Sequence, residues 1–279
     1  MKFFSYLIAC AIFGMLMPNF LMSQDQSLIK KHIIPATNDH DTIRFGLMIP
    51  PSYNENGRNY PVLYYLHGLN GHYADWKAQK VAEFCTINMK DEVIPEYLVV
   101  FPDGGEGFWC NHYDGDPLLE DEIIKYLIPY IDQNYPTDQG ERLIMGWSAG
   151  GAGTMVLFSK HPKLFKGAFS LDASIMGPED FQQFQGQRPD IFNSSDYYYE
   201  YCSPNEWMSR NREMILEKQD TALFITAAFL APYHQDLLSI LKAEGIPFYY
   251  KELACEHQFD CVFQGTSNDL LSFLSKSFE

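Results

Sequence analysis

The fold is decided by residues 142–161, which read RLIMGWSAGGAGTMVLFSKH. Arg142 to Met145 is typical of a buried strand, and Gly151 to His161 is typical of a helix. Between them, Gly146-Trp147-Ser148-Ala149-Gly150 matches G-x-S-x-G, in which a serine sits on a sharp turn from strand to helix. The alternative is a glycine turn that matches the motif by chance, but such a turn need not have a strand directly before it and a helix directly after it. The stretch therefore predicts that Ser148 is an exposed nucleophile at the carboxyl edge of a sheet.

The same alternation of strand and helix continues on both sides of this motif. Apolar runs predict buried strands at Pro61–Leu66, Tyr97–Phe101, Gly167–Leu171 and Ala222–Thr226, and helical spacing marks Glu120–Gln133 and His234–Glu244. Residues 41–50 resemble antiparallel strands preceding the sheet, and residues 178–220 are predicted to form an irregular excursion over one end of it. Continuous apolar strands alternating with helices indicate an α/β fold with a mostly parallel sheet and helices on both faces.

Composition narrows the function classes. The 279 residues include 36 acidic and 20 basic side chains, for a formal net charge of -16. Such a surface repels phosphate backbones and anionic lipids, so nucleic-acid binding and membrane docking are not expected. The hydrophobic fraction of 46% is ample for a packed core.

The N-terminus reads as a targeting segment. Lys2 precedes a nearly continuous apolar run from Phe3 to Met22, which predicts a signal peptide over residues 1–23 and a single mature domain over residues 24–279. An uncleaved anchor is the alternative, because the run is nearly long enough to span a bilayer. Cleavage predicts a secreted or periplasmic protein with no membrane attachment.

Five cysteines follow this segment: Cys85, Cys110, Cys202, Cys255 and Cys261. An oxidising compartment permits disulfides, and the odd count leaves at least one thiol unpaired, although the sequence does not fix the connectivity. No CxxC pair is present, so no metal site is predicted.

Two further motifs complete the predicted chemistry. His67-Gly68-Leu69 ends the strand Pro61–Leu66, where such a turn supplies one backbone N–H of an oxyanion hole. The hole would be formed by the amides of Leu69 and Ala149, with His67 orienting the turn. Near the C-terminus, His257 follows a predicted strand and is the one histidine with the chain order that a general base requires.

These motifs resemble the esterase D and feruloyl esterase branch of the α/β-hydrolases, over roughly residues 40–275. The similarity is carried by PVLYYLHG, VVFPDGGEGFW and GWSAGGAGTMVLFSKHPKLFKGAFSLDAS. That branch includes S-formylglutathione hydrolases, tributyrin-type esterases, xylan side-chain esterases and mycolyltransferases. The resemblance implies the α/β-hydrolase fold, acyl-ester or thioester chemistry without a cofactor, Ser148 as nucleophile and His257 as base.

The sequence departs from this family in two places. The family places its triad acid after the strand that is here Ala222–Thr226, yet no carboxylate lies between Thr226 and Tyr233. The family's Gly-Gly-His-x-Trp around the base is here Cys255 to Phe259. Both departures bear on the missing acid.

Asp172 is the predicted acid, because it directly follows the strand Gly167–Leu171 at the expected edge of the sheet. A turn-capping role is the alternative for this residue. Asp236 is the second candidate, Glu256 is disfavoured because neighbours on an extended chain face apart, and a Ser–His dyad without an acid is the remaining possibility.

The predicted function is hydrolysis of carboxylic esters through an acyl-enzyme on Ser148. The substrate is a small-molecule or glycan ester, with acetyl or hydroxycinnamoyl groups on extracellular carbohydrate favoured. Trp109 and Trp147 are predicted to line the substrate pocket, or else to be ordinary packing aromatics. An inactive binding protein on the same fold and an acyltransferase are the alternatives, and the oligomeric state stays open.

Overall fold

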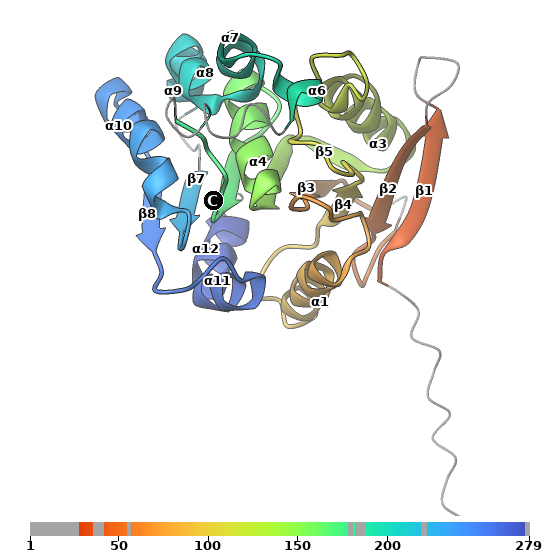
Figure 1. Ribbon diagram of the computed structural model, residues 1–279. Helices are drawn as coiled ribbons and strands as arrows, with labels where there is room; N and C mark the ends of the chain where they lie inside the picture. The colour runs from red at the N-terminus through yellow and green to blue at the C-terminus, as the bar shows by residue number, and fades with distance from the viewer. Residues whose placement is uncertain are drawn as a thin grey trace, which may run out of the picture.

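A computed structural model describes residues 28–35, 42–54, 57–177, 181, 188–218 and 222–276. Its centre is one eight-stranded sheet with the strand order β1-β2-β4-β3-β5-β6-β7-β8 (Figure 1). The strands are β1 Lys30–Pro35, β2 Thr42–Met48, β3 Tyr60–Leu66, β4 Leu98–Pro102, β5 Thr137–Trp147, β6 Gly167–Leu171, β7 Ala222–Ala227 and β8 Tyr249–Glu252.

Six neighbouring strands, β4-β3-β5-β6-β7-β8, pair in parallel. The strand β2 is antiparallel to both of its neighbours, β1 and β4. Parallel strands bring their carboxyl ends to one edge of the sheet, where ligand sites of such folds lie. Residues that follow β3, β4, β5, β6 and β7 therefore meet at a common edge.

Helices cover both faces of the sheet (Figure 1). One face carries α3, α4, α8, α9 and α10, and the other carries α1, α11 and α12. The helical bounds are α1 Trp76–Lys90, α2 Leu119–Asp121, the π-helical turn η1 Glu122–Leu127, α3 Ile128–Asn134, α4 Ala149–Lys160, α6 Pro189–Phe192, α7 Ser195–Tyr197, the π-helical turn η3 Tyr198–Cys202, α8 Pro204–Arg210, α9 Arg212–Leu216, the 3₁₀ turn η4 Ala231–His234, α10 Gln235–Glu244, α11 Phe259–Gly265 and α12 Ser267–Lys276.

The apolar core lies in two layers, one on each face of the sheet. All residues of β3, β4 and β6 are buried, as expected of central strands covered on both sides. Side chains of α3, α4 and α10 pack on one face, and those of α1, α11 and α12 pack on the other. The two layers fix the central strands and so hold their carboxyl ends rigidly in place.

The predicted α/β-hydrolase architecture, with a mostly parallel sheet and helices on both faces, is confirmed. The antiparallel strand expected in residues 41–50 is β2, but it belongs to the sheet itself, where it pairs with β4, rather than preceding the sheet. The described part of 178–220 contains the short helices α6 to α9 rather than irregular chain alone. The predicted signal peptide, residues 1–23, lies outside the described residues.

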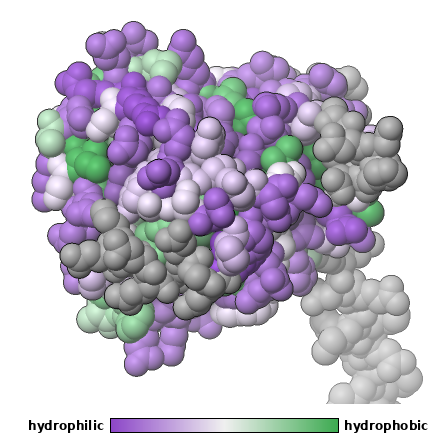
Figure 2. Space-filling model, turned by 45° about the horizontal axis from the view of Figure 1, so that its top comes forward, coloured by the Kyte–Doolittle hydropathy of each residue, from purple (hydrophilic) through white to green (hydrophobic). Residues whose placement is uncertain are grey.

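The surface in view is mainly polar. Figure 2 shows that hydrophilic residues cover most of one face, with hydrophobic residues in small separate groups. Within the described ranges, no helix has the length and apolar character needed to cross a bilayer.

Candidate active site

Ser148 stands on the turn between β5 and α4 with backbone angles φ 57° and ψ -118°. Few residues other than glycine adopt positive φ, and such strained positions cluster at functional sites. The turn also requires close packing, because a Cβ on Gly146 would lie 2.2 Å from the carbonyl oxygen of Gly150. A Cβ on Gly150 would lie 2.1 Å from the carbonyl oxygen of Leu66. The two glycines thus allow α4 to start directly against β3 and β5.

A continuous hydrogen-bonded chain joins Ser148, His257 and Asp172. His257 Nε2 lies 2.9 Å from Ser148 Oγ, and His257 Nδ1 lies 2.6 Å from Asp172 Oδ2. With Asp172 ionised, Nδ1–H donates to the carboxylate, which leaves Nε2 free to accept the serine proton. The arrangement therefore has the nucleophile, base and acid order of a serine hydrolase.

The Asp172 carboxylate is fully buried and held on both oxygens. Its Oδ1 accepts hydrogen bonds from the backbone N–H groups of Ala228, at 2.8 Å, and Leu230, at 3.0 Å. Burial is the largest influence on this group and opposes its ionisation. The hydrogen bonds from His257, Ala228 and Leu230 together outweigh it, so the pKa of Asp172 lies below its ordinary value. Asp172 is therefore a permanent anion beside the imidazole at neutral pH.

The position of Asp172 explains how the chain manages without a carboxylate after β7. In the sheet, β6 lies between β5 and β7, so its carboxyl end adjoins both the nucleophile and the loop after β7. That loop has no carboxylate of its own. Instead, its backbone N–H groups of Ala228 and Leu230 donate hydrogen bonds to the Asp172 carboxylate. The other candidate carboxylates, Asp236 and Glu256, are exposed. These amides could not be predicted, because backbone N–H groups are the same in every residue type except proline.

Trp147 forms a platform under the imidazole of His257. The two rings stack with centroids 4.5 Å apart and an interplanar angle of 16°, and Phe259 contacts the indole edge-on at 5.4 Å. Trp147 is only 4% exposed. Of the two roles predicted for Trp147, the structure therefore supports packing, here against His257, rather than lining a substrate pocket.

Two backbone amides are available for an oxyanion. Ala149 is the first residue of α4, where an N–H has no partner within the helix. Within the described ranges, neither Ala149 nor Leu69 donates its N–H to a main-chain acceptor outside regular elements. The positive end of the α4 dipole adds to this potential. Both predicted amides thus keep a free donor at the edge that holds Ser148.

His67 ties the Leu69 turn to the loop after β4. Its Nε2 accepts a hydrogen bond from Gly104 N at 2.9 Å, so its Nδ1–H donates to the carbonyl oxygen of Gly68 at 2.7 Å. His67 is 1% exposed. It orients the turn, as expected from the sequence, and stays out of reach of a substrate.

Trp109 also supports this turn from below. Its indole N–H donates to the carbonyl oxygen of His67 at 3.0 Å, and its ring lies against that of His67 at 4.8 Å. Because only 1% of Trp109 is exposed, its predicted place in the substrate pocket is not what the structure shows. Its size and hydrogen bond serve packing.

The cysteines pair as Cys110–Cys202 and Cys255–Cys261, and Cys85 is a buried free thiol. In the part of the chain that the structure describes, no group of three or more histidine, cysteine or acidic side chains is arranged to hold a metal ion.

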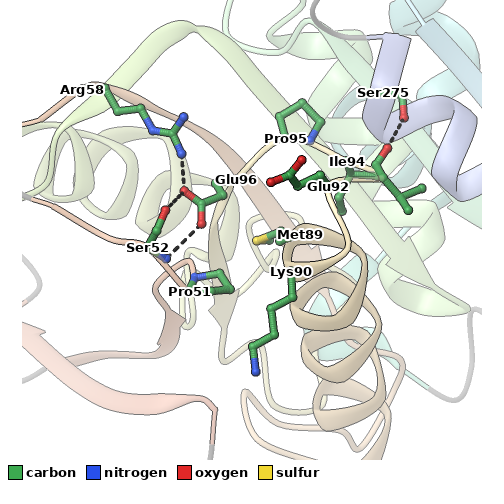
Figure 3. Close-up of a pocket in the computed structure, with 11 residues that line it drawn as sticks. Pro51, Ser52, Arg58, Met89, Lys90, Glu92, Ile94, Pro95, Glu96 and Ser275 are labelled. Carbon is green, nitrogen blue, oxygen red and sulfur yellow. Dashed lines mark hydrogen bonds and ion pairs between the residues drawn. The ribbon is translucent and has the colours of Figure 1, made fainter.

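A large hollow of about 690 Å³ lies elsewhere on the molecule, at the C-terminal end of α1 (Figure 3). There Glu96 accepts hydrogen bonds from the backbone N–H of Ser52 at 2.9 Å and its hydroxyl at 2.6 Å, and it pairs with Arg58. Arg58 thus pairs with the Glu96 carboxylate, and the residues that line the hollow include no histidine to act as the base of a serine. Glu96 lies just before the start of β4, so this hollow is at the amino-terminal edge of the parallel strands, opposite the edge that holds Ser148.

Comparison with known sequences gives a consistent result. The family model described as "Putative esterase" matches residues 37–208. An esterase of Mycobacterium tuberculosis (strain ATCC 25618 / H37Rv) is 28% identical over 144 residues, which make up 49% of this chain and 29% of that protein. The chain thus spans under a third of that relative's length. An acetyl esterase of Caldicellulosiruptor saccharolyticus is 24% identical over 225 residues, covering 74% of this chain and 80% of that protein.

Solved structures with the same fold include a ferulic acid esterase, with a TM-score of 0.74, 19% identity and coverage of 90% of this chain and 98% of that one. An S-formylglutathione hydrolase from Agrobacterium tumefaciens has a TM-score of 0.70 and 15% identity, with 92% of this chain and 99% of that chain covered. At these identities the likeness establishes the α/β-hydrolase fold.

Proposed function

The chain belongs to the putative esterase family, and from that premise we propose that it hydrolyses carboxylic esters through an acyl-enzyme on Ser148. The observation that carries the proposal is the chain of hydrogen bonds from Ser148 through His257 to Asp172. A serine hydroxyl is a weak nucleophile by itself and requires an adjacent base that a third group orients.

In the proposed reaction, Ser148 Oγ attacks the ester carbonyl while His257 Nε2 takes its proton. The amides of Leu69 and Ala149 donate to the oxyanion, and the buried Asp172 carboxylate stabilises the imidazolium. The protonated His257 then gives its proton to the leaving alcohol. Water repeats these steps on the acyl-enzyme and releases the acid, so no cofactor is needed.

The proposed substrates are small acyl groups, acetyl or hydroxycinnamoyl, on extracellular carbohydrate. Export is supported by the two disulfides, which form in oxidising compartments. A polar hollow of about 410 Å³ supports a carbohydrate ligand, because charged groups such as Arg44, Asp103 and Asp190 line it. Carboxylates and guanidinium groups are well suited to hydrogen-bond sugar hydroxyls.

This polar hollow lies at the same edge of the sheet as Ser148. Asp103 directly follows β4, and only β3 separates β4 from β5. Two strand spacings place it roughly 10 Å along the edge from the nucleophile's strand, which suits a sugar next to the acylated one. Arg44 is exposed and forms no ion pair with any residue in the described ranges, so its guanidinium is available to a ligand.

The test is a panel of chromogenic aryl esters and acylated oligosaccharides, run on wild type, Ser148→Ala and Arg44→Ala. We expect Ser148→Ala to abolish all hydrolysis. Arg44→Ala should raise KM for acylated oligosaccharides and leave aryl acetates unchanged, with Arg58→Ala, in the distant hollow, as its control. Turnover by Ser148→Ala would disprove the mechanism, whereas hydrolysis of aryl esters alone would indicate a general carboxylesterase.

The rival role, an inactive binding protein on this fold, drew its support from the missing acid. Asp172 removes that support, because it occupies the partner position on His257 Nδ1. Transfer of the acyl group to a hydroxyl acceptor uses the same residues. Adding a sugar alcohol to the ester assay and identifying the products separates transfer from hydrolysis.

A further inference from the structure

The two disulfides differ in their exposure to solvent. Cys110 and Cys202 are 0% and 6% exposed, so that bond is sealed inside the protein. Cys255 is half-buried and Cys261 is exposed. A reductant in solution therefore reaches the second bond more readily than the first.

The exposed disulfide encloses His257 in a short covalent loop. Cys255 precedes the histidine by two residues, and Cys261 lies in α11. This helix is anchored because Phe259, Val262 and Phe263 are buried against the sheet. The bond therefore ties the segment that carries His257 to a fixed element.

Few other restraints hold this segment. The last main-chain hydrogen bond before it runs from Leu253 N to Ala227 O at 2.8 Å, and the next runs from Gln258 N to Glu256 O at 2.6 Å. Within the described ranges, the N–H groups of residues 254–257 donate no hydrogen bond to the main chain. Leu253 and Cys255 pack against the core at the start of this segment. Beyond that packing and the disulfide, the position of His257 depends on the contacts of its own ring.

Those ring contacts are the ones used in the proposed catalysis. The imidazole of His257 is hydrogen-bonded to Ser148 and Asp172 and stacked on Trp147. Even so, 33% of the His257 side chain is exposed to solvent. An exposed loop with few backbone hydrogen bonds opens easily. A covalent closure limits the conformations that the loop can visit.

We propose that the Cys255–Cys261 disulfide is a redox-sensitive clamp that positions His257 for proton transfer, so that its reduction lowers turnover. The inference rests on the proposed esterase function. In the reducing step, a dithiol gives up two electrons and two protons, the bond between the two Sγ atoms breaks, and each sulfur becomes a thiol. The dithiol itself becomes a cyclic disulfide.

The free cysteine does not complicate this chemistry. Burial raises the pKa of the Cys85 thiol to about 12, so it carries no thiolate at neutral pH. It is 0% exposed and is not available for exchange with either disulfide. The two thiols released from the clamp are therefore the ones that a mild reductant and an alkylating reagent mark first.

The experiment treats the wild-type protein with a mild dithiol, alkylates the free thiols and identifies them by peptide mass spectrometry. Hydrolysis of an aryl acetate is measured before reduction, after reduction and after reoxidation of an unalkylated sample. Cys255→Ser/Cys261→Ser gives the same comparison without reductant, and Cys110→Ser/Cys202→Ser is the matched control. Melting temperature and circular dichroism report whether the fold is intact.

With only Cys255 and Cys261 reduced, we expect kcat to fall on the order of tenfold to 10²-fold, because small misplacements of a catalytic group have effects of this size. KM should stay unchanged and reoxidation should restore the rate. A loss of less than about threefold overturns the proposal, as does a loss that appears only with reduction of Cys110–Cys202 or with unfolding. Failure of the oxidised protein to hydrolyse any ester instead disproves the proposed function.

Discussion

Replacing Asp172 by asparagine tests the identity of the acid, because the structure dictates how the new side chain must lie. Its oxygen must remain toward the N–H groups of Ala228 and Leu230, which now bond Oδ1 at 2.8 and 3.0 Å. A flipped amide would set its own donors against these two. The NH₂ group must therefore face His257 Nδ1, at the place where Oδ2 now lies 2.6 Å away.

An NH₂ group at this place selects the wrong tautomer of His257. The amide donates to Nδ1, which must then be unprotonated, so the proton moves to Nε2. With a proton on Nε2, the ring cannot accept the proton of Ser148. An exchange of this kind lowers turnover on the order of 10⁴-fold, about 5 kcal/mol in the activation barrier.

The assay measures kcat and kcat/KM with an aryl acetate for wild type, Asp172→Asn and Asp236→Asn. Asp236 is exposed on α10, so its variant is the matched control and should stay within about twofold of wild type. Asp172→Asn keeps its three hydrogen-bonding partners but loses the negative charge that strengthens these bonds. We therefore expect the unfolding free energy to fall by about 1–2 kcal/mol and the melting temperature by only a few degrees. Activity of Asp172→Asn within about tenfold of wild type would refute the reasoning and indicate a Ser–His dyad.

Three further predictions concern the stability of the protein in acid, the tryptophan stacked on His257 and the two disulfides. Because the pKa of Asp172 is below its ordinary value of 3.8, its carboxylate adds stability above that pH and loses it as the pH falls through the lower native value. In urea unfolding, the stability gap between wild type and Asp172→Asn should therefore shrink as the pH falls below about 4. A gap that widens below this pH contradicts the reasoning. Trp147→Leu removes the stacked platform of His257 and should lower kcat by roughly three- to tenfold, whereas Trp147→Phe keeps an aromatic face and most of the rate. Equal rates in the two variants would show that stacking is unimportant. The Cys110–Cys202 bond spans a sequence separation of 92 and Cys255–Cys261 one of 6, so in the chain-entropy model their loss lowers the unfolding free energy by about 5 and about 2 kcal/mol. Denaturant unfolding of the two double-serine variants checks this order, and the reverse order would contradict it.

The core of the fold could be predicted because central parallel strands are apolar along their whole length. The predicted strand Gly167–Leu171 coincides with β6, and Ala222–Thr226 differs from β7 by one residue. The helix α1 was missed although it carries a signal. Asp75 caps it by accepting from Lys77 N and Ala78 N, and buried residues recur along one face.

The candidate site was only partly open to prediction. Ser148 lies in a local motif, whereas Asp172 was one of several carboxylates until the strand order placed β6 between β5 and β7. The two tryptophans were predicted from residue type alone. Burial decides their role, and burial depends on packing between segments distant in sequence, such as Trp147 against Phe259. The disulfide pairing could not be predicted for the same reason: the spacing of cysteines in the sequence does not determine which of them meet in the fold.

The most direct test of the central proposal is the site of covalent labelling by a fluorophosphonate, located by peptide mass spectrometry on the purified, oxidised protein. Ser148 is half-buried on its strained turn with His257 Nε2 at 2.9 Å, so its Oγ should displace fluoride stoichiometrically and the peptide should gain the mass of the probe minus HF. Labelling should vanish in Ser148→Ala and be strongly slowed in His257→Ala. A label on any other residue, or unchanged labelling of Ser148→Ala, would contradict the assignment of Ser148 as the nucleophile.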